Sequence, residues 1–142
     1  MPKETKEVLL KKLERIKILL ADLERLLVKP IEAHLGDKTP ILAAQRIFEL
    51  IVELASDINT SLILDKTGKT PDSYREAFSE LSKLETNHGL VAPLIESAKL
   101  RNILIHEYDF EADDKRFYES AKNMIPAYRE YLKFVHDYLT KN

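Results

Sequence analysis

Three segments of the chain place apolar residues at alternating spacings of four and three, and this repeat is the feature that most constrains the fold. Because a helix turns about 100° per residue, the repeat lines one face of a helix, here called a seam, with apolar side chains. The seam of the first segment, about residues 5–34, contains Leu9, Leu13, Ile16, Leu20, Leu23 and Leu27. The second contains Ala44, Phe48, Ile51, Ala55, Ile58 and Leu62, and the last contains Phe117, Ala121, Met124, Tyr128, Tyr131, Val135 and Tyr138. Each seam needs a partner helix to cover it, and this need predicts an all-α fold.

Proline and capping residues mark where the predicted helices end. Pro30 is expected to kink or end the first helix, and Thr39 followed by Pro40 predicts the N-cap and first helical residue of the second. The second helix carries a further apolar row at Ile47, Leu50 and Leu54, so it is expected to be the central, most buried helix.

The second half of the chain predicts two more long helices and one short one. A loop is expected over 65–72, followed by a short helix from the capping box Ser73–Glu76 through about Leu84. The next helix is expected to run from Leu90 to His106 or Tyr108, with Pro93 in its first turn. The last helix follows the acidic residues 109–114, and Pro126 predicts a kink in it. Four long helices and one short helix predict an antiparallel helical bundle that forms a single domain over residues 1–142.

Composition excludes several kinds of protein. The chain has no cysteine, which excludes thiolate metal sites, disulfides and cysteine redox chemistry. Its 22 basic and 24 acidic residues give a net charge of −2, which argues against a strongly basic nucleic-acid binder. No apolar run approaches the roughly 18 residues of a membrane span, so we expect a soluble, cytoplasmic protein. His136 has no histidine or acidic partner at metal-ligand spacing, and no metal or other cofactor is expected.

The octet from Arg101 to Tyr108, RNILIHEY, concentrates polar groups around an apolar triplet. On a helix Asn102 and His106 share one face, whereas Arg101 and His106 point about 140° apart. One straight helix therefore does not aim Arg101 and His106 at the same small ligand. Either the helix ends near His106, or a second copy of the chain completes the site.

This octet resembles the signature of HEPN-domain ribonuclease toxins of the HepT-like branch, which is Arg, four residues, His, one residue and Tyr. Arg101, His106 and Tyr108 occupy those positions. The resemblance covers most of the chain, because other residues also match the branch: Gln45, Arg46, Asn59 and the block Pro71-Asp72-Ser73-Tyr74-Arg75-Glu76-Ala77-Phe78.

The resemblance implies an HEPN-like helical bundle that forms a homodimer, in which two motif helices meet and pool their arginines and histidines in one RNA-binding cleft. It implies a metal-independent endoribonuclease that is the toxin of a type II/VII-like toxin–antitoxin module. It also implies a minimal nucleotidyltransferase (MNT-type) antitoxin, which neutralises the toxin by transferring AMP to the motif tyrosine, Tyr108.

The motif residues have side chains suited to RNA cleavage. His106 exchanges protons near neutral pH and is expected to be the base or the acid. Arg101 offers a fixed cationic fork for phosphate oxygens, and Asn102 is expected to orient the imidazole or donate to the phosphate. Acidic residues crowd behind the motif at Glu107 and over 109–114, where their charge repels RNA. Compensating RNA contacts are expected from three basic residues, namely Lys99, Arg75 and Arg46.

Two other functions are compatible with the sequence. One is a non-catalytic dimeric partner that binds a nucleotidyltransferase or a nucleotide, which the acidic residues after the motif favour. The other is a helical oligomerisation domain in which the octet has only a structural role.

Overall fold

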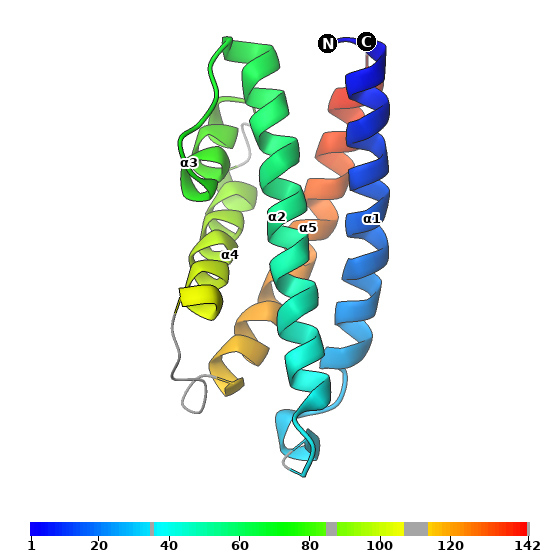
Figure 1. Cartoon of the computed structure of the whole chain (residues 1–142), viewed down its shortest axis with the longest axis vertical. Coiled ribbons are helices and arrows are strands. Elements are labelled where there is room, and N and C mark those ends of the chain that lie inside the picture. The colour runs from blue at the N-terminus through cyan, green and yellow to red at the C-terminus, as the bar shows by residue number, and fades with distance from the viewer. Residues whose placement is uncertain (35, 85–87, 107–113, 142) are drawn as a thin grey trace.

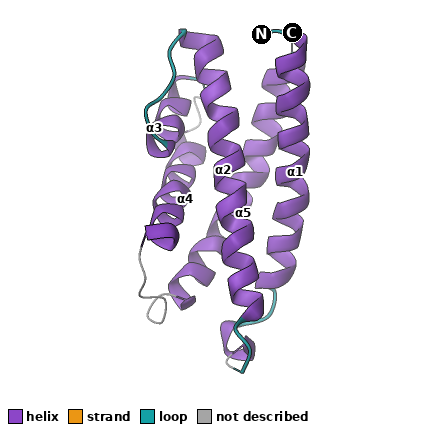
Figure 2. Ribbon diagram, viewed as in Figure 1, coloured by secondary structure: helices purple, strands orange, loops and turns teal. Residues whose placement is uncertain are grey.

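The computed structural model describes residues 1–34, 36–84, 88–106 and 114–141, and the regular structure within these ranges is helical (Figures 1 and 2). The elements in chain order are α1 (Lys3–Leu27), the 3-10 helix η1 (Ile31–His34), α2 (Thr39–Thr67), α3 (Tyr74–Ser79), the 3-10 helix η2 (Glu80–Lys83), α4 (His88–His106) and α5 (Asp114–Thr140). Figure 1 shows α1, α2, α4 and α5 running alternately down and up the long axis, with α3 beside α4. The predicted antiparallel bundle of four long helices and one short helix is confirmed.

The helix α2 lies at the centre of the bundle and packs against α1, α3, α4 and α5. All of its predicted seam residues are buried, and Val52 and Ile63 are buried beside them. The second apolar row, Ile47, Leu50 and Leu54, is half-buried. The prediction that this helix is the central one is therefore confirmed, and its burial on several sides accounts for its nearly continuous apolar sequence.

The other two seams meet α2 and each other. Every predicted seam residue of α1 is buried, and so is every predicted seam residue of α5 except Tyr138. Tyr138 is half-buried and its hydroxyl donates to Asp65 Oδ2 at 2.9 Å, while the N-terminal amine of Met1 lies 3.3 Å from Asp65 Oδ1. The hydrogen bond from Tyr138 lowers the pKa of Asp65. Both ends of the chain are thus tied to the last turns of α2, near the point where Figure 1 places the two termini together.

A layer of buried polar groups crosses the core between α2, α4 and α5. Tyr131 is buried and its hydroxyl lies 2.6 Å from Asn59 Oδ1 and 3.1 Å from the carbonyl oxygen of Ala55. Tyr128 is paired with Ser97 of α4 at 2.7 Å, and the Ser97 hydroxyl donates to the carbonyl oxygen of Leu94 at 2.6 Å. Burial raises the pKa of both phenols, so they remain neutral donors. Because these hydrogen bonds can form in only one relative position of the helices, the layer specifies how α4 faces α2 and α5.

The first helix ends at Leu27, just before Pro30, which was expected to kink or end it. The chain resumes as the separate 3-10 helix η1 after Pro30, which has no backbone N–H to donate. The predicted start of the second helix was wrong. Thr39 is not the N-cap of the second helix, because Lys38 holds that position. Asp37 supplies the missing acceptor, since its Oδ1 atom lies 3.0 Å from the Thr39 backbone nitrogen.

The boundaries around α3 and α4 also differ from the predicted ones. The expected short helix is divided into α3 and the 3-10 helix η2. The motif helix starts at His88 rather than Leu90, so Pro93 lies inside the helix and not in its first turn as predicted. The last helix continues through Pro126, and the expected kink there stays a prediction. In the described ranges, no helix combines the length and the apolar character that crossing a membrane requires.

Replacing Leu62 by alanine should lower the free energy of unfolding by about 2–5 kcal/mol, because its side chain is fully buried and truncation leaves a cavity. Leu64, two residues later on the same helix, is 46% exposed, and Leu64→Ala should change stability by about 0.5 kcal/mol or less. Urea denaturation followed by circular dichroism measures both changes. Equal losses in the two variants would contradict the central position of the α2 seam.

Candidate active site

Arg101 of α4 is held by groups from three helices. Its Nη2 atom lies 3.2 Å from Oε1 of Glu53 on α2, and its Nη1 atom lies 3.3 Å from Oδ1 of its neighbour Asn102. Its guanidinium carbon lies 4.5 Å from the centre of the ring of Tyr74, the first residue of α3. These contacts fix the plane of the guanidinium group as well as its position.

The capping box of α3 explains how Tyr74 reaches this position. The backbone N–H of Glu76 donates to Ser73 Oγ at 3.1 Å, as predicted from the sequence. The Glu76 carboxylate accepts from the backbone N–H of Asp72 at 3.2 Å, one residue before the N-cap. Ala77 and Phe78 are buried below. The short helix is thus fixed at its first turn, where Tyr74 meets Arg101.

The other motif residues are described to different extents. Asn102 is half-buried and contacts Arg101 through its side-chain oxygen. His106 is the last residue of α4 that the structure describes, and the predicted end of the motif helix at His106 or Tyr108 lies at the limit of the described residues. The helix is unbroken between Arg101 and His106, and these two positions are therefore separated by about 140° around its axis. The side chain of His106 and the whole of Tyr108 lie outside the described residues, as do Glu107 and residues 109–113.

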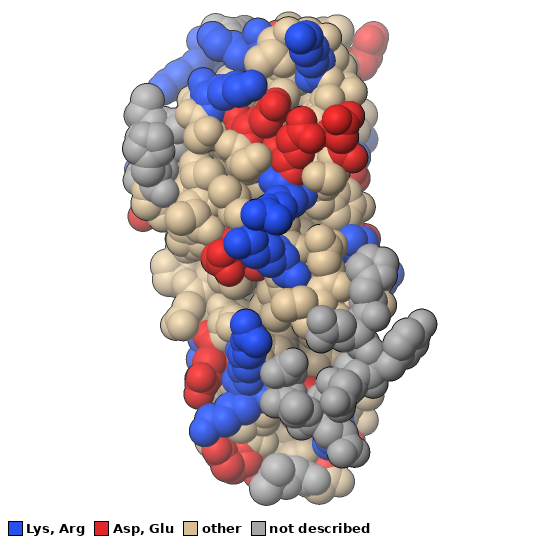
Figure 3. Space-filling model, turned by 90° about the vertical axis from the view of Figure 1, so that its left-hand side faces the viewer, with Lys and Arg blue, Asp and Glu red and all other residues tan. Residues whose placement is uncertain are grey.

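The three basic residues expected to contact RNA differ in their surroundings. Arg46 Nη1 lies 3.2 Å from Glu49, and Lys99 Nζ lies 3.1 Å from Glu96, so each is paired with an acid one turn away. Arg75 is exposed on α3 and has no ion pair among the residues that the structure describes. Figure 3, which views the side of the molecule where α3 and α4 lie in Figure 1, shows basic and acidic groups interspersed over this face. Its charge is therefore mixed, and no continuous basic surface covers this view.

Two residues outside the octet that match the HepT-like branch have structural contacts in the fold. Asn59 is fully buried and accepts the hydrogen bond from Tyr131, and Gln45 Nε2 lies 3.3 Å from Asp114 Oδ1 at the start of α5. Glu53, in contrast, was not identified from the sequence although it touches Arg101 directly. Its only sequence signal is an acid between Val52 and Leu54 in an otherwise apolar part of α2.

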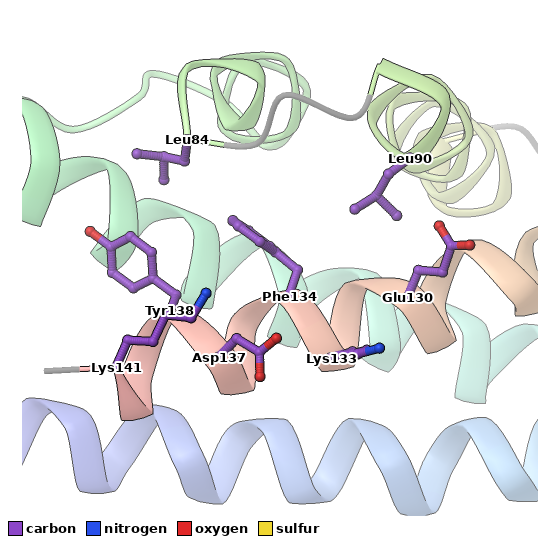
Figure 4. A pocket seen from close by; sticks show the side chains of 8 residues that line it. All are labelled: Leu84, Leu90, Glu130, Lys133, Phe134, Asp137, Tyr138 and Lys141. Carbon is purple, nitrogen blue, oxygen red and sulfur yellow. The ribbon is translucent and has the colours of Figure 1, made fainter.

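A separate pocket of about 500 Å³ lies between α5 and the segments before and at the start of α4 (Figure 4). Apolar side chains of Leu84, Leu90 and Phe134 line it together with charged residues of α5, and it shares no residue with the Arg101 cluster. Its α5 charges alternate in sign at helical spacing, which is typical of a solvated helix face. Among the described residues there is also no group of three histidine, aspartate or glutamate side chains that could hold a metal ion.

Comparison with known proteins decides the family. A model of the family described as "Ribonuclease HepT-like" matches residues 10–135, which is most of the chain. The chain belongs to this family. Membership assigns it to a class of ribonucleases, as the resemblance of the octet implied. A similar protein of this family is the tRNA nuclease HepT of Aphanizomenon flos-aquae, which is 30% identical over 111 residues that cover 77% of this chain and 74% of the relative.

Solved structures share the fold of this HepT-like chain. One is a toxin–antitoxin crystal structure with AMP-PNP, which is 16% identical and superposes with a TM-score of 0.77 over 95% of this chain and 99% of the other. Another is the tri-AMPylated Shewanella oneidensis HEPN toxin in complex with MNT antitoxin, with 18% identity and a TM-score of 0.65 over 92% of this chain and 99% of the other. At these identities the similarity establishes the HEPN fold.

Replacing Ser73 by alanine should destabilise the first turn of α3 by about 1 kcal/mol, because the Glu76 N–H loses its acceptor. Amide hydrogen exchange measures this as faster exchange in residues 76–79. Ser82→Ala is the control, since the Ser82 hydroxyl only donates to the carbonyl oxygen of Ser79 at 2.8 Å in the following 3-10 helix. Equal exchange rates in wild type and Ser73→Ala would contradict the capping box.

Proposed function

We propose that this HepT-like protein is the toxin of a toxin–antitoxin module and cleaves RNA in the cytoplasm without a metal ion. The observation that carries the proposal is the fixed position of Arg101 on the helix that also carries His106, in the order that the family signature requires. The similarity to a protein named tRNA nuclease supports RNA as the substrate.

The proposed chemistry is transesterification by side chains alone. A base removes the proton of the ribose 2′-hydroxyl, whose oxygen attacks the adjacent phosphorus, and an acid protonates the departing 5′-oxygen. His106 serves as the base or the acid, since imidazole gains and loses a proton near neutral pH. Arg101 stabilises the additional negative charge on the phosphate with N–H groups that are already oriented. Asn102 orients the reacting groups from the same turn of the helix.

A homodimer built on α4 would bring together the groups that one helix separates. Apolar residues occur on all sides of α4, although α4 lies at the edge of the bundle. Ile103 and Leu104 are only half-buried, and Ile105 is 37% exposed. An apolar face of this kind is covered when a second copy packs against it. In the dimer, Arg101 of one protomer and His106 of its partner approach the same phosphate.

RNA contacts outside the motif are assigned most strongly to Arg75. Lys99 is paired with Glu96, and Arg46 is paired with Glu49. Each must give up its ion pair before it can bind a phosphate. Arg75 projects from the helix that also carries Tyr74, so it lies one residue from the ring that supports Arg101. A phosphate bound by both arginines would bridge α3 and α4.

An MNT-type antitoxin is the proposed partner, and transfer of AMP to Tyr108 is its proposed action. Support comes from the fold shared with the AMPylated Shewanella oneidensis toxin in complex with MNT antitoxin and from the position of Tyr108 in the motif. Each AMP group adds bulk and at least one negative charge two residues from His106, where it excludes RNA phosphate by size and by charge.

His106→Ala should abolish RNA cleavage and growth inhibition while the helical content stays that of the wild type. The control is His136→Ala, because His136 is exposed on α5 and away from the motif helix. Gel assays on a total tRNA preparation measure cleavage, and circular dichroism measures folding. Retained cleavage by His106→Ala would contradict the mechanism. A wild-type protein that cleaves no RNA, yet forms a stable complex with a nucleotidyltransferase, would support the non-catalytic alternative.

Co-expression with a cognate MNT-type nucleotidyltransferase should add whole AMP masses to the protein and stop RNA cleavage. Intact-mass spectrometry detects the additions, and peptide mapping should place one of them on Tyr108. Tyr108→Phe removes the accepting hydroxyl and should prevent that addition. The control is Tyr138→Phe, whose hydroxyl is engaged with Asp65 at 2.9 Å. AMP found only on other residues would contradict the assignment of Tyr108.

A further inference from the structure

We infer that Glu53 is a positioning residue for Arg101, which orients the guanidinium group for the phosphate and competes with the phosphate for its charge. This inference rests on the proposed ribonuclease function. It adds an acid on α2, outside the motif, to the groups that determine the rate of cleavage.

Arg101 is more buried than the lysine and arginine side chains of seven other ion pairs in the described residues. The Arg101 side chain is 16% exposed, whereas the basic side chains of those seven pairs are between 34% and 76% exposed. Exposed pairs contribute little to stability because water and salt screen them. A cation as buried as Arg101 needs a nearby acceptor, and Glu53 on α2 provides it at 3.2 Å.

The geometry of the pair leaves part of the guanidinium group available to a substrate. Glu53 takes one hydrogen bond, from Nη2, instead of the two that a carboxylate can accept from an arginine. The ring of Tyr74 covers one face of the group. The Nε atom is buried and has no hydrogen-bond partner among the described residues. Because Nε is buried, while Nη1 donates to Asn102 Oδ1 and Nη2 to Glu53, a phosphate must approach in the plane of the group through the remaining N–H groups of Nη1 and Nη2.

Two opposite effects on catalysis follow from this arrangement. An arginine that is free to move loses side-chain entropy when it binds the phosphate in the transition state. Arg101 is already held before RNA binds and avoids this loss, which corresponds to about a 30-fold gain in rate. The Glu53 carboxylate also neutralises part of the charge that attracts RNA. A residue with only a structural role would produce neither effect at temperatures where the fold is intact.

Glu53 is not part of the apolar core. The helix α2 is anchored by its buried seam, from Ala44 to Leu62, and Glu53 is half-buried at the edge of that seam. Substitution of Glu53 should therefore leave a folded protein in which only the environment of Arg101 has changed. Circular dichroism melting curves establish this before kinetics are compared.

The test compares Glu53→Ala and Glu53→Gln on one RNA that the wild type cleaves, selected from a total tRNA preparation. Glu53→Ala should lower kcat about 30-fold, because Arg101 is no longer oriented, and should lower KM as Glu53→Gln does, because both variants lack the competing charge. Glu53→Gln keeps an acceptor oxygen and should hold kcat within about threefold of wild type while lowering KM, because the competing charge is gone.

The matched controls are Asp57→Ala and Asp57→Asn. Asp57 lies one turn after Glu53 on the same helix and is paired with Lys12 at 3.4 Å, so its substitution removes the same charge without touching Arg101. Both controls should leave kcat and KM unchanged. A folded Glu53→Ala variant with wild-type kcat would overturn the inference. So would equal losses in Glu53→Ala and Asp57→Ala.

A measurement without RNA separates this inference from the proposed function. NMR relaxation experiments measure the mobility of the Nε–H group of Arg101, whose signal is assigned as the one missing from an Arg101→Lys variant. This group should be rigid in the wild type and in Glu53→Gln, and mobile in Glu53→Ala. If the wild type cleaves no RNA, the ribonuclease proposal fails, and this result still decides whether Glu53 holds Arg101. Equal rigidity of Arg101 in wild type and in Glu53→Ala would overturn the positioning role.

Discussion

Burial of the apolar faces of α2 is the constraint around which this protein is arranged. A helix with one apolar stripe can be satisfied by one neighbour, but α2 has buried residues on more than one side and needs several. The helices α1, α4 and α5 pack against the apolar faces of α2, and α3 packs against its remaining side. The candidate active site is built where α2, α3 and α4 meet, so its geometry depends on the same packing that forms the core.

Buried polar contacts determine the orientation of the motif helix within this packing. Apolar contacts alone tolerate small rotations and shifts of a helix, whereas hydrogen bonds between buried groups do not. Ser97 is bonded to Tyr128 of α5 one turn before Arg101, on nearly the same face of α4. The bond holds α4 in the rotation at which Arg101 meets Glu53. The apolar residues of α4 allow the helix to pack in more than one rotation. The polar layer selects the rotation, and with it the direction in which Arg101 faces.

The seams were predictable because they depend on local periodicity. The seam residues of α1 and α2 were expected on buried faces from their spacing, and all of them are buried. Helix ends were less predictable, since Asp37 caps α2 from outside the helix. The roles of individual polar residues were least predictable. Asn59 and Gln45 match the HepT-like branch outside the octet, but the contacts that they make are within the core and with the start of α5.

The sequence by itself determined the helical faces, the absence of cysteine chemistry and the order of arginine, histidine and tyrosine in the motif, because each of these is a property of neighbouring residues. Only the tertiary structure decided what surrounds Arg101. Glu53 is 48 positions away in the chain, and Tyr74 belongs to a different short helix. No spacing rule connects residues on separate helices, since their contact depends on how each helix is rotated against its neighbours. The acid and the aromatic ring that hold the motif arginine are therefore visible only once α2, α3 and α4 are packed together.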